Sequence, residues 1–195
     1  AWWLRRSLFA PEDLAGLSGA DSVAVDPHKW LYAPLEAGCA LVREPDRLRA
    51  AFSYHPPYYH FEEWATNYVD YGPQNSRGFR ALKVWLGLRQ VGREGYIRMI
   101  GDDIALAQAL YAALGRYPEL QPMTQHLSIT TFRYVPPDLP GDPAAVEEYL
   151  NTLNEELLNR LQKGGEVFIS NAVLDGRYLL RACIVNFRTT LADVE

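Results

Sequence analysis

The sequence predicts a mixed α/β protein made of two units, residues 1–82 and residues 83–195. Short runs of β-branched and apolar residues, bounded by turn residues, alternate with stretches in which apolar residues recur every three or four positions. In the second unit the expected order is helix, helix, strand, helix and hairpin. That order is typical of an α+β domain whose antiparallel sheet is covered by helices on one face.

Two short strands are expected near the start of the chain, after a short surface helix within residues 1–20. Residues 23–25 form a β-branched run that Asp26-Pro27 ends, because proline cannot continue a ladder of hydrogen bonds. Residues 38–42 form a second apolar run. Strands this close in sequence are expected to pair as antiparallel neighbours. Residues 46–52 then predict a short helical turn.

Residues 53–78 mix aromatic and polar side chains without a sustained helical or strand period. An irregular stretch of this length is more often a functional loop than an idle connection. Helical spacing returns at residues 79–91, and Gly92 and Gly95 are expected to interrupt it. A long helix is predicted at residues 96–117, with Pro118 beyond its end.

The C-terminal part of the chain carries clear start and stop signals. Asp142 as N-cap and Pro143 as first helical residue predict a helix that Gly164-Gly165 ends. Asp175-Gly176 predicts a hairpin turn, and Thr189 or Thr190 is expected to cap a last helix. Strands are expected at residues 127–134, 167–169 and 178–185.

Composition and charge argue against several classes of function. The net charge of −5 and the pI near 5.4 disfavour a nucleic-acid surface, because phosphate binding needs clustered Lys and Arg. No apolar run reaches the roughly 18 residues that a membrane span needs. Cys39 and Cys183 lie far apart without a CxxC pattern, which predicts reduced, buried thiols in a cytoplasmic protein. Together with His55, His60 and His126, which lack the spacing of metal ligands, they predict no metal site.

One stretch, residues 21–31, points to chemistry. Lys29 follows the first strand directly behind the Asp26-Pro27 turn, beside Trp30 and Leu31. An ammonium is poorly solvated in apolar surroundings, so the pKa of Lys29 is expected to fall. The amine would then be a nucleophile toward an aldehyde. The structural alternative is a lysine that reaches from the strand end into water.

The order Asp21-Ser22, three residues, then Asp26-Pro27-His28-Lys29-Trp30 resembles the Schiff-base lysine segment of the group II pyridoxal phosphate (PLP) decarboxylases. This family includes the aromatic amino acid, histidine and glutamate decarboxylases, and the resemblance extends along nearly the whole chain. It implies an α/β fold of PLP fold type I, like that of aspartate aminotransferase. Residues 1–82 would end the large PLP-binding domain, and residues 83–195 would form the small C-terminal domain, truncated at its end.

The resemblance also implies a part that is missing. In the family, the Asp that pairs with the pyridine nitrogen and the ring stacked on the cofactor come before the point where this chain begins. The chain also starts without an initiator Met. The sequence is therefore expected to be a piece of a longer protein, with the missing N-terminal half as its partner. A homodimer with the active site at the subunit interface is implied as well.

Three residues are assigned to the cofactor and to the substrate carboxylate. The resemblance makes Lys29 the Schiff-base residue and places His28 against the PLP phosphate, with a hydrogen-bonded structural histidine as the alternative. Arg181, inside an apolar run, matches the carboxylate-binding arginine of the family, whose planar fork would orient the amino acid substrate. The alternative is an arginine on the wet face of an edge strand.

Two further residues are assigned to the reaction and to specificity. Tyr58 matches the family's mobile-loop tyrosine, the catalytic proton donor to Cα, while Tyr54 and Tyr59 stay open as competitors. The structural alternative for these three tyrosines is a packed aromatic patch. Ser76 stands where the family approaches the substrate side chain, at a position that is Gly in aromatic amino acid decarboxylases and Ser in histidine decarboxylases.

The predicted function is PLP-dependent decarboxylation of an L-amino acid, an aromatic one by preference, to the amine and carbon dioxide. Within enzymes the alternatives are histidine as substrate, or an aldehyde synthase, which a phenylalanine in place of Tyr58 would have favoured. From a different class, the alternative is a noncatalytic fragment or interaction partner that keeps the fold without the cofactor half.

Overall fold

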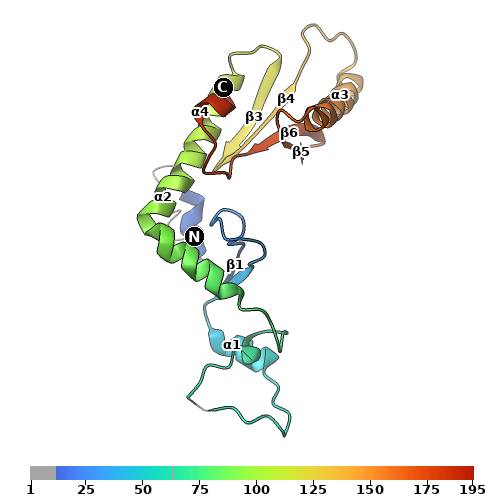
Figure 1. Cartoon of the computed structure of the whole chain (residues 1–195). Helices are drawn as coiled ribbons and strands as arrows, with labels where there is room; N and C mark the ends of the chain where they lie inside the picture. Colours follow the sequence, from blue (N-terminus) through green and yellow to red (C-terminus); the bar gives the residue numbers. More distant parts are fainter. Residues whose placement is uncertain (1–11, 63) are drawn as a thin grey trace. The chain divides into compact units, whose positions relative to one another are not determined.

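The computed structural model describes residues 12–62 and 64–195 (Figure 1). They form two compact units, one spanning Ala15–Gly92 and the other containing Arg93–Glu195. The first has a two-stranded sheet and the second a four-stranded sheet. The boundary in the chain falls at Gly92, and the division into family domains at residue 82 stays a prediction.

The first unit is built on a small antiparallel sheet. After the 3-10 helix η2 (Glu12–Gly19), strand β1 (Ser22–Val25) pairs with β2 (Cys39–Val42) from Ser22 opposite Val42 to Val25 opposite Cys39. The predicted antiparallel pairing is therefore confirmed. Between the strands, the Lys29 amide donates to the Asp26 carbonyl (3.0 Å) and the Ala33 amide to the Pro27 carbonyl (3.0 Å), which folds this connection into a tight turn.

Helix α1 (Pro45–Phe52) confirms the short helix expected after the second strand, and Pro45 stands at its first turn. The predicted irregular stretch follows. It contains one short element, the 3-10 helix η3 (Tyr68–Tyr71), in which Asp70 is buried.

Helix α2 (Arg80–Leu114) is interrupted as predicted at Gly92, whose φ of 67° and ψ of 170° are not helical. Glycine adopts this backbone conformation without the steric penalty that a Cβ atom would bring. The expected second break, at Gly95, is wrong, because that residue lies in regular helix. The apolar side of the second half of α2 is buried, including Ile100, Ile104 and Ala107.

The second unit contains an antiparallel sheet in the order β3-β4-β6-β5. Its strands are β3 (Leu120–His126), β4 (Ile129–Tyr134), β5 (Ser170–Leu174) and β6 (Arg177–Cys183). Strand β3 was not predicted, because Pro122 and its polar neighbours mask the strand pattern, and the register shifts between Pro122 and Thr124. The strand expected at residues 167–169 is wrong, since pairing begins only at Ser170, opposite Arg181.

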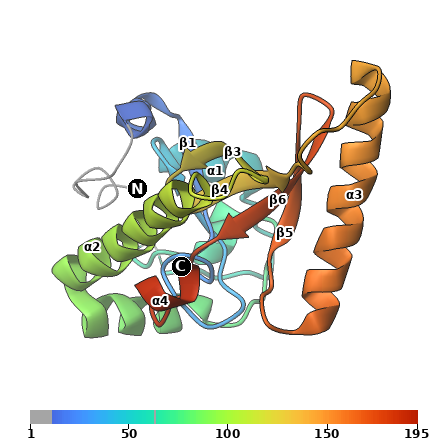
Figure 2. The ribbon, with the colours of Figure 1, turned by 90° about the horizontal axis from the view of Figure 1, so that it is seen from above.

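Helix α3 (Pro143–Gly164) begins and ends where the sequence predicts. The Asp142 carboxylate accepts hydrogen bonds from the amides of Ala144 (3.1 Å) and Ala145 (3.4 Å), and Gly165, with a φ of 80°, closes the other end. Figure 2 shows α3 running alongside β5 and β6.

Two contacts tie the helices of this unit to its sheet. The fully buried Asn154 of α3 bonds both backbone groups of Tyr134, and the Thr130 hydroxyl donates to the Ala107 carbonyl of α2 (2.7 Å). The chain closes with α4 (Leu191–Val194), and Thr190 is its N-cap, in line with one of the two predicted caps.

Candidate functional site

The amine of Lys29 faces a carboxylate of its own turn. Lys29 Nζ lies 2.6 Å from Oδ2 of Asp26, because the turn brings residues three apart onto one side. The hydrogen bond from Lys29 is the main reason that the pKa of the Asp26 carboxyl lies below its ordinary value of 3.8. The Lys29 side chain is 69% exposed. The expectation that apolar side chains surround this amine is therefore wrong for the described chain, because the amine is solvated and paired with Asp26.

His28, in the same turn, is held by the backbone of Ala37. Its Nδ1 lies 2.6 Å from the carbonyl oxygen of Ala37 and 3.1 Å from the Ala37 amide nitrogen. The tautomer decides which of these two contacts is the hydrogen bond. Ala37 is 1% exposed, so this anchor is fixed in the interior. Since Nδ1 is occupied, Nε2 is the ring nitrogen that His28 can offer to a ligand.

Arg181 lies on β6, in the unit that contains Arg93–Glu195. Its neighbours across the sheet are Thr131 on β4 and Ser170 on β5, so β6 is an interior strand and the edge-strand alternative is wrong. The side chain is half-buried and donates from a terminal nitrogen to Ser170 Oγ (3.2 Å). Among the described residues no carboxylate pairs with Arg181, which leaves donors of the guanidinium for an acidic ligand.

The three candidate tyrosines differ in their surroundings. Tyr54 is 78% exposed and Tyr58 is 73% exposed. Tyr59 is held on two sides: its hydroxyl accepts a hydrogen bond from the Asn75 side chain (2.8 Å), and its ring meets that of Tyr58 edge to face at 5.0 Å. Tyr58 is thus exposed but supported, whereas Ser76 is exposed on the surface of the loop.

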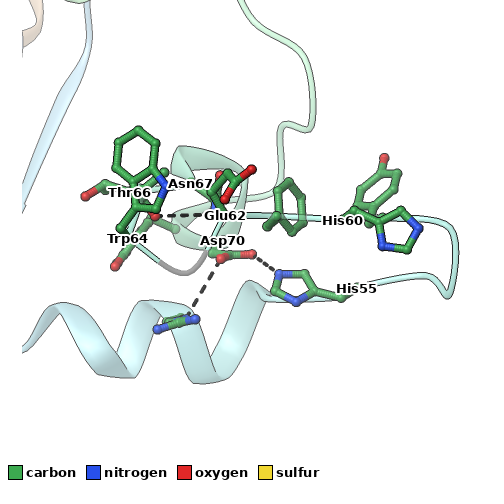
Figure 3. A pocket seen from close by; sticks show the side chains of 12 residues that line it. His55, His60, Glu62, Trp64, Thr66, Asn67 and Asp70 are labelled. Carbon is green, nitrogen blue, oxygen red and sulfur yellow. Dashed lines mark hydrogen bonds and ion pairs between the residues drawn. The ribbon is translucent and has the colours of Figure 1, made fainter.

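A buried carboxylate that the sequence analysis missed lies in the same unit (Figure 3). Asp70 is 3% exposed, and its Oδ1 accepts from His55 Nε2 (2.7 Å) and Ser53 Oγ (3.1 Å), while Oδ2 lies 3.9 Å from Arg49 Nε. The hydrogen bond from His55 is the largest cause that keeps the pKa of Asp70 below 3.8. An acidic residue between Val69 and Tyr71 is the sequence signal that could have indicated it.

Asp70, His55 and Arg49 are among the residues that line a pocket of ≈ 580 Å³. The pocket mixes rings with polar groups and is lined by Arg49, His55, Tyr59, His60, Phe61, Glu62, Trp64, Ala65, Thr66, Asn67, Asp70 and Tyr71. Ser53, His55 and Asp70 do not form a nucleophilic triad, because Ser53 and Asp70 contact the same nitrogen, Nε2, of His55. A triad needs its serine and its carboxylate on opposite ring nitrogens.

Other groups of the described chain were assessed for ligand binding. In residues 12–62 and 64–195, no three side chains of His, Cys, Asp or Glu gather in a way that could hold a metal ion. Over the same ranges, each helix is too short or too polar to cross a bilayer. Cys39 and Cys183 are free and both are exposed, so the expectation of buried thiols is wrong. Each stands at the end of a strand, Cys39 opening β2 and Cys183 closing β6.

Comparison with known proteins defines the class of this chain as that of pyridoxal-dependent enzymes. A family model described as the pyridoxal-dependent decarboxylase conserved domain matches residues 7–135. The chain belongs to the pyridoxal-dependent decarboxylase family.

Individual relatives agree with this assignment. The chain is 34% identical over 186 residues to an aromatic-L-amino-acid decarboxylase of Bacillus atrophaeus, covering 93% of this chain and 38% of the relative. It is 35% identical over 186 residues to a histidine decarboxylase of Drosophila melanogaster, covering 93% of this chain and 20% of that protein. The chain therefore spans well under half the length of these curated relatives.

Solved structures show the same fold. The crystal structure of Oryza sativa TDC with PLP and tryptamine superposes with a TM-score of 0.81 at 28% identity, covering 93% of this chain and 38% of that one. The predicted α/β architecture of PLP fold type I is confirmed.

Proposed function

We propose that this chain is the lysine-bearing part of a PLP-dependent decarboxylase that removes carbon dioxide from an L-amino acid, with aromatic amino acids as the preferred substrates. The observation that carries the proposal is the turn Pro27-His28-Lys29-Trp30, in which consecutive residues carry an anchored imidazole and an accessible amine within a family-matched segment. The similarity to an aromatic-L-amino-acid decarboxylase supports the choice of substrate.

The lysine turn offers donors that suit PLP, and Arg181, in the other unit, offers donors that suit a carboxylate. Lys29 offers a primary amine to the aldehyde group, and His28 offers Nε2 to the phosphate. The guanidinium of Arg181, with donors to spare, would hold the substrate carboxylate. When bound, PLP supplies an electron-withdrawing ring that accepts the electron pair left as carbon dioxide departs.

The chain's own residues would then control protons and solvent. Lys29 would have to leave Asp26 and pass a proton to water, which reaches its exposed side chain, before its lone pair is free for an aldehyde. Tyr58 would deliver a proton to Cα of the product from its exposed hydroxyl, with Tyr54 and Tyr59 as competitors. The loop that carries these tyrosines would exclude water from the reacting atoms. Ser76 would face the substrate side chain.

Histidine is the second candidate substrate. Ser at position 76 and the 35% identity to a histidine decarboxylase both favour it. An aldehyde synthase remains the alternative outcome, and a noncatalytic chain remains the alternative from another class. The proposal includes a cytoplasmic homodimer together with the N-terminal half that the family carries.

Labelling of the lysines tests the proposal. The chain is combined with the N-terminal half of a family member, incubated with PLP and reduced with borohydride. The modified peptides are then identified by mass spectrometry. We expect the label on Lys29 and little on Lys83 or Lys163, which serve as internal controls. Equal labelling of the three lysines would contradict the proposal, and so would a protein that stays colourless with PLP. Analysis of the amine products from a panel of amino acids then identifies the substrate.

A further inference from the structure

We propose that Asp70 is a positioning residue that ties together the two ends of the loop carrying Tyr58 and Tyr59, and that it orients these tyrosines through a row of ring-to-ring contacts. The Asp70 carboxylate and its partners Arg49, Ser53 and His55 are called the Asp70 clasp below. The contacts of the Asp70 clasp do not depend on the proposed function. Only their effect on proton transfer by Tyr58 rests on it.

The Asp70 clasp joins residues that are distant in sequence. Ser53 and His55 start the loop and Asp70 follows its end, 17 and 15 residues further on. Asp70 is 3% exposed, and a buried charge is costly unless it is paired and hydrogen-bonded. The carboxylate therefore stays buried only while both ends of the loop remain beside it.

Backbone hydrogen bonds fix the conformation at both ends of the loop. The amide of Ser53, the C-cap of α1, donates to the Arg49 carbonyl (2.9 Å), and the amide of Asp70 donates to the Asn67 carbonyl (3.0 Å). Apart from the start of η3, the backbone of the described residues in between forms local turns, such as that closed by the Tyr59 amide and the Pro56 carbonyl (2.9 Å). Closing a loop that lacks regular structure costs conformational entropy, and the Asp70 clasp offsets this cost.

A row of aromatic contacts leads from the Asp70 clasp to the candidate proton donor. The His55 ring meets Phe61 at 4.8 Å, Phe61 meets Tyr59 at 5.3 Å, and Tyr59 meets Tyr58 at 5.0 Å. The last two contacts are edge to face, at 82° and 89°, a geometry that aromatic pairs favour. Because Asp70 fixes the His55 ring, it also sets where this row of rings ends.

Hydrogen exchange read by mass spectrometry tests the clasp on the chain without cofactor or substrate. In Asp70→Asn we expect amides of residues 54–62 and 64–69 to exchange several-fold faster, while those of β1, β2 and α2 keep their rates. Asp46→Asn, which removes an exposed carboxylate of α1, is the matched control and should change nothing in the loop. Unchanged loop rates in Asp70→Asn, or equal acceleration in β1 and β2, would overturn the proposal.

A second measurement tests the row of rings. Fluorotyrosine placed at position 58 gives a ¹⁹F resonance, which should move toward the value of a free tyrosine in both Asp70→Asn and Phe61→Leu. Phe61→Leu breaks the row while leaving the Asp70 clasp intact, so residues 53–55 and 70 should keep their exchange rates. A ¹⁹F resonance unchanged in either variant would overturn the role of the rings. Neither result depends on PLP labelling of Lys29, so the clasp and the proposed function fail separately.

Discussion

Asn154 shows how a single polar side chain fixes a helix to a sheet. Its amide nitrogen donates to the carbonyls of Tyr134 and Leu150 (both 2.9 Å), and its oxygen accepts from the Tyr134 amide (2.7 Å). The side chain is fully buried, so water cannot replace these bonds. Asn154 thus satisfies the backbone at the end of β4 with a residue of α3.

We expect Asn154→Ala to lower the free energy of unfolding by about 1–3 kcal/mol for each buried group that is left without a partner. Urea denaturation followed by circular dichroism measures the loss. Asn151→Ala is the control, because Asn151 makes similar bonds to Gly176 (2.9 Å) and Tyr178 (2.7 Å) from a partly exposed position that water can reach. Equal losses in the two variants would show that burial does not decide the cost.

The pairing of Asp26 with Lys29 gives a prediction about reactivity. Removing the carboxylate in Asp26→Asn frees the amine, so we expect Lys29 to be modified more than in the parent chain when an aldehyde and borohydride are added. The ratio of modified Lys29 to modified Lys83, read by peptide mass spectrometry, measures the effect. A ratio identical to that of the parent chain would mean that the ion pair does not restrain the amine.

Motif residues were found from the sequence, but their surroundings were not. The turn that carries His28 and Lys29 follows from a β-branched run ended by Asp-Pro, which is local information. The apolar setting expected for Lys29 was wrong, because adjacency to Trp30 does not decide what an amine faces; the turn directs it to Asp26. Asp70 was missed for a related reason: closure of the loop brings its partners to it, and no local spacing encodes that closure.

At the scale of elements, the C-terminus of α3 offers a clean comparison of two adjacent glycines. Gly164 is the last helical residue, whereas Gly165 has a φ of 80°. A Cβ atom at either position would meet nothing within 4 Å, so backbone conformation alone decides the effect of a substitution.

We expect Gly165→Ala to destabilise the chain by about 1–2 kcal/mol, because left-handed backbone is costly for residues with a Cβ atom. Gly164→Ala should instead be neutral or stabilising by up to about 1 kcal/mol, since alanine favours helix over glycine. Thermal denaturation of the two variants beside the parent measures both shifts. Opposite signs support the assignment of the helix end, and a loss of stability in Gly164→Ala would contradict it.

Helices were easier to predict than strands. Asp142, Pro143 and Gly165 mark the ends of α3 through local capping, so the sequence sufficed there. Strand pairing depends on distant partners instead. Val167 and Phe168 looked like strand residues, yet they are 44% and 83% exposed and precede the first paired residue, Ser170.

At the scale of the whole molecule, the titratable side chains predict a range of pH over which the free energy of unfolding stays constant. The pKa values of three carboxyls lie below 3.8: Asp26 through Lys29, Asp70 through His55, and Asp193 through the backbone and side chain of Thr190. Stability from a lowered pKa is complete above the unfolded value and is lost as pH falls through the folded one. Burial raises the pKa of Tyr96 and Tyr178 above 10.0. Their contribution to the free energy of unfolding is complete below 10.0 and is lost as pH rises through the folded pKa.

These groups predict a melting temperature that is flat near neutral pH, falls below about pH 4 and falls again above about pH 10. Differential scanning calorimetry across the pH range measures this profile. In Asp70→Asn the melting temperature should fall less steeply at acid pH, while its fall at alkaline pH should match that of the parent. A melting temperature that already declines between pH 5 and 6 would show that other groups control acid sensitivity.

The exposed thiols of Cys39 and Cys183 affect how the proposed homodimer can be recognised. In air-saturated buffer, an intermolecular disulfide would join two chains, and the pair would elute together in size-exclusion chromatography. Such a covalent pair has the mass of a true dimer but none of its interface. Only an association that survives dithiothreitol, or persists after both cysteines are replaced by serine, would therefore count as the proposed homodimer.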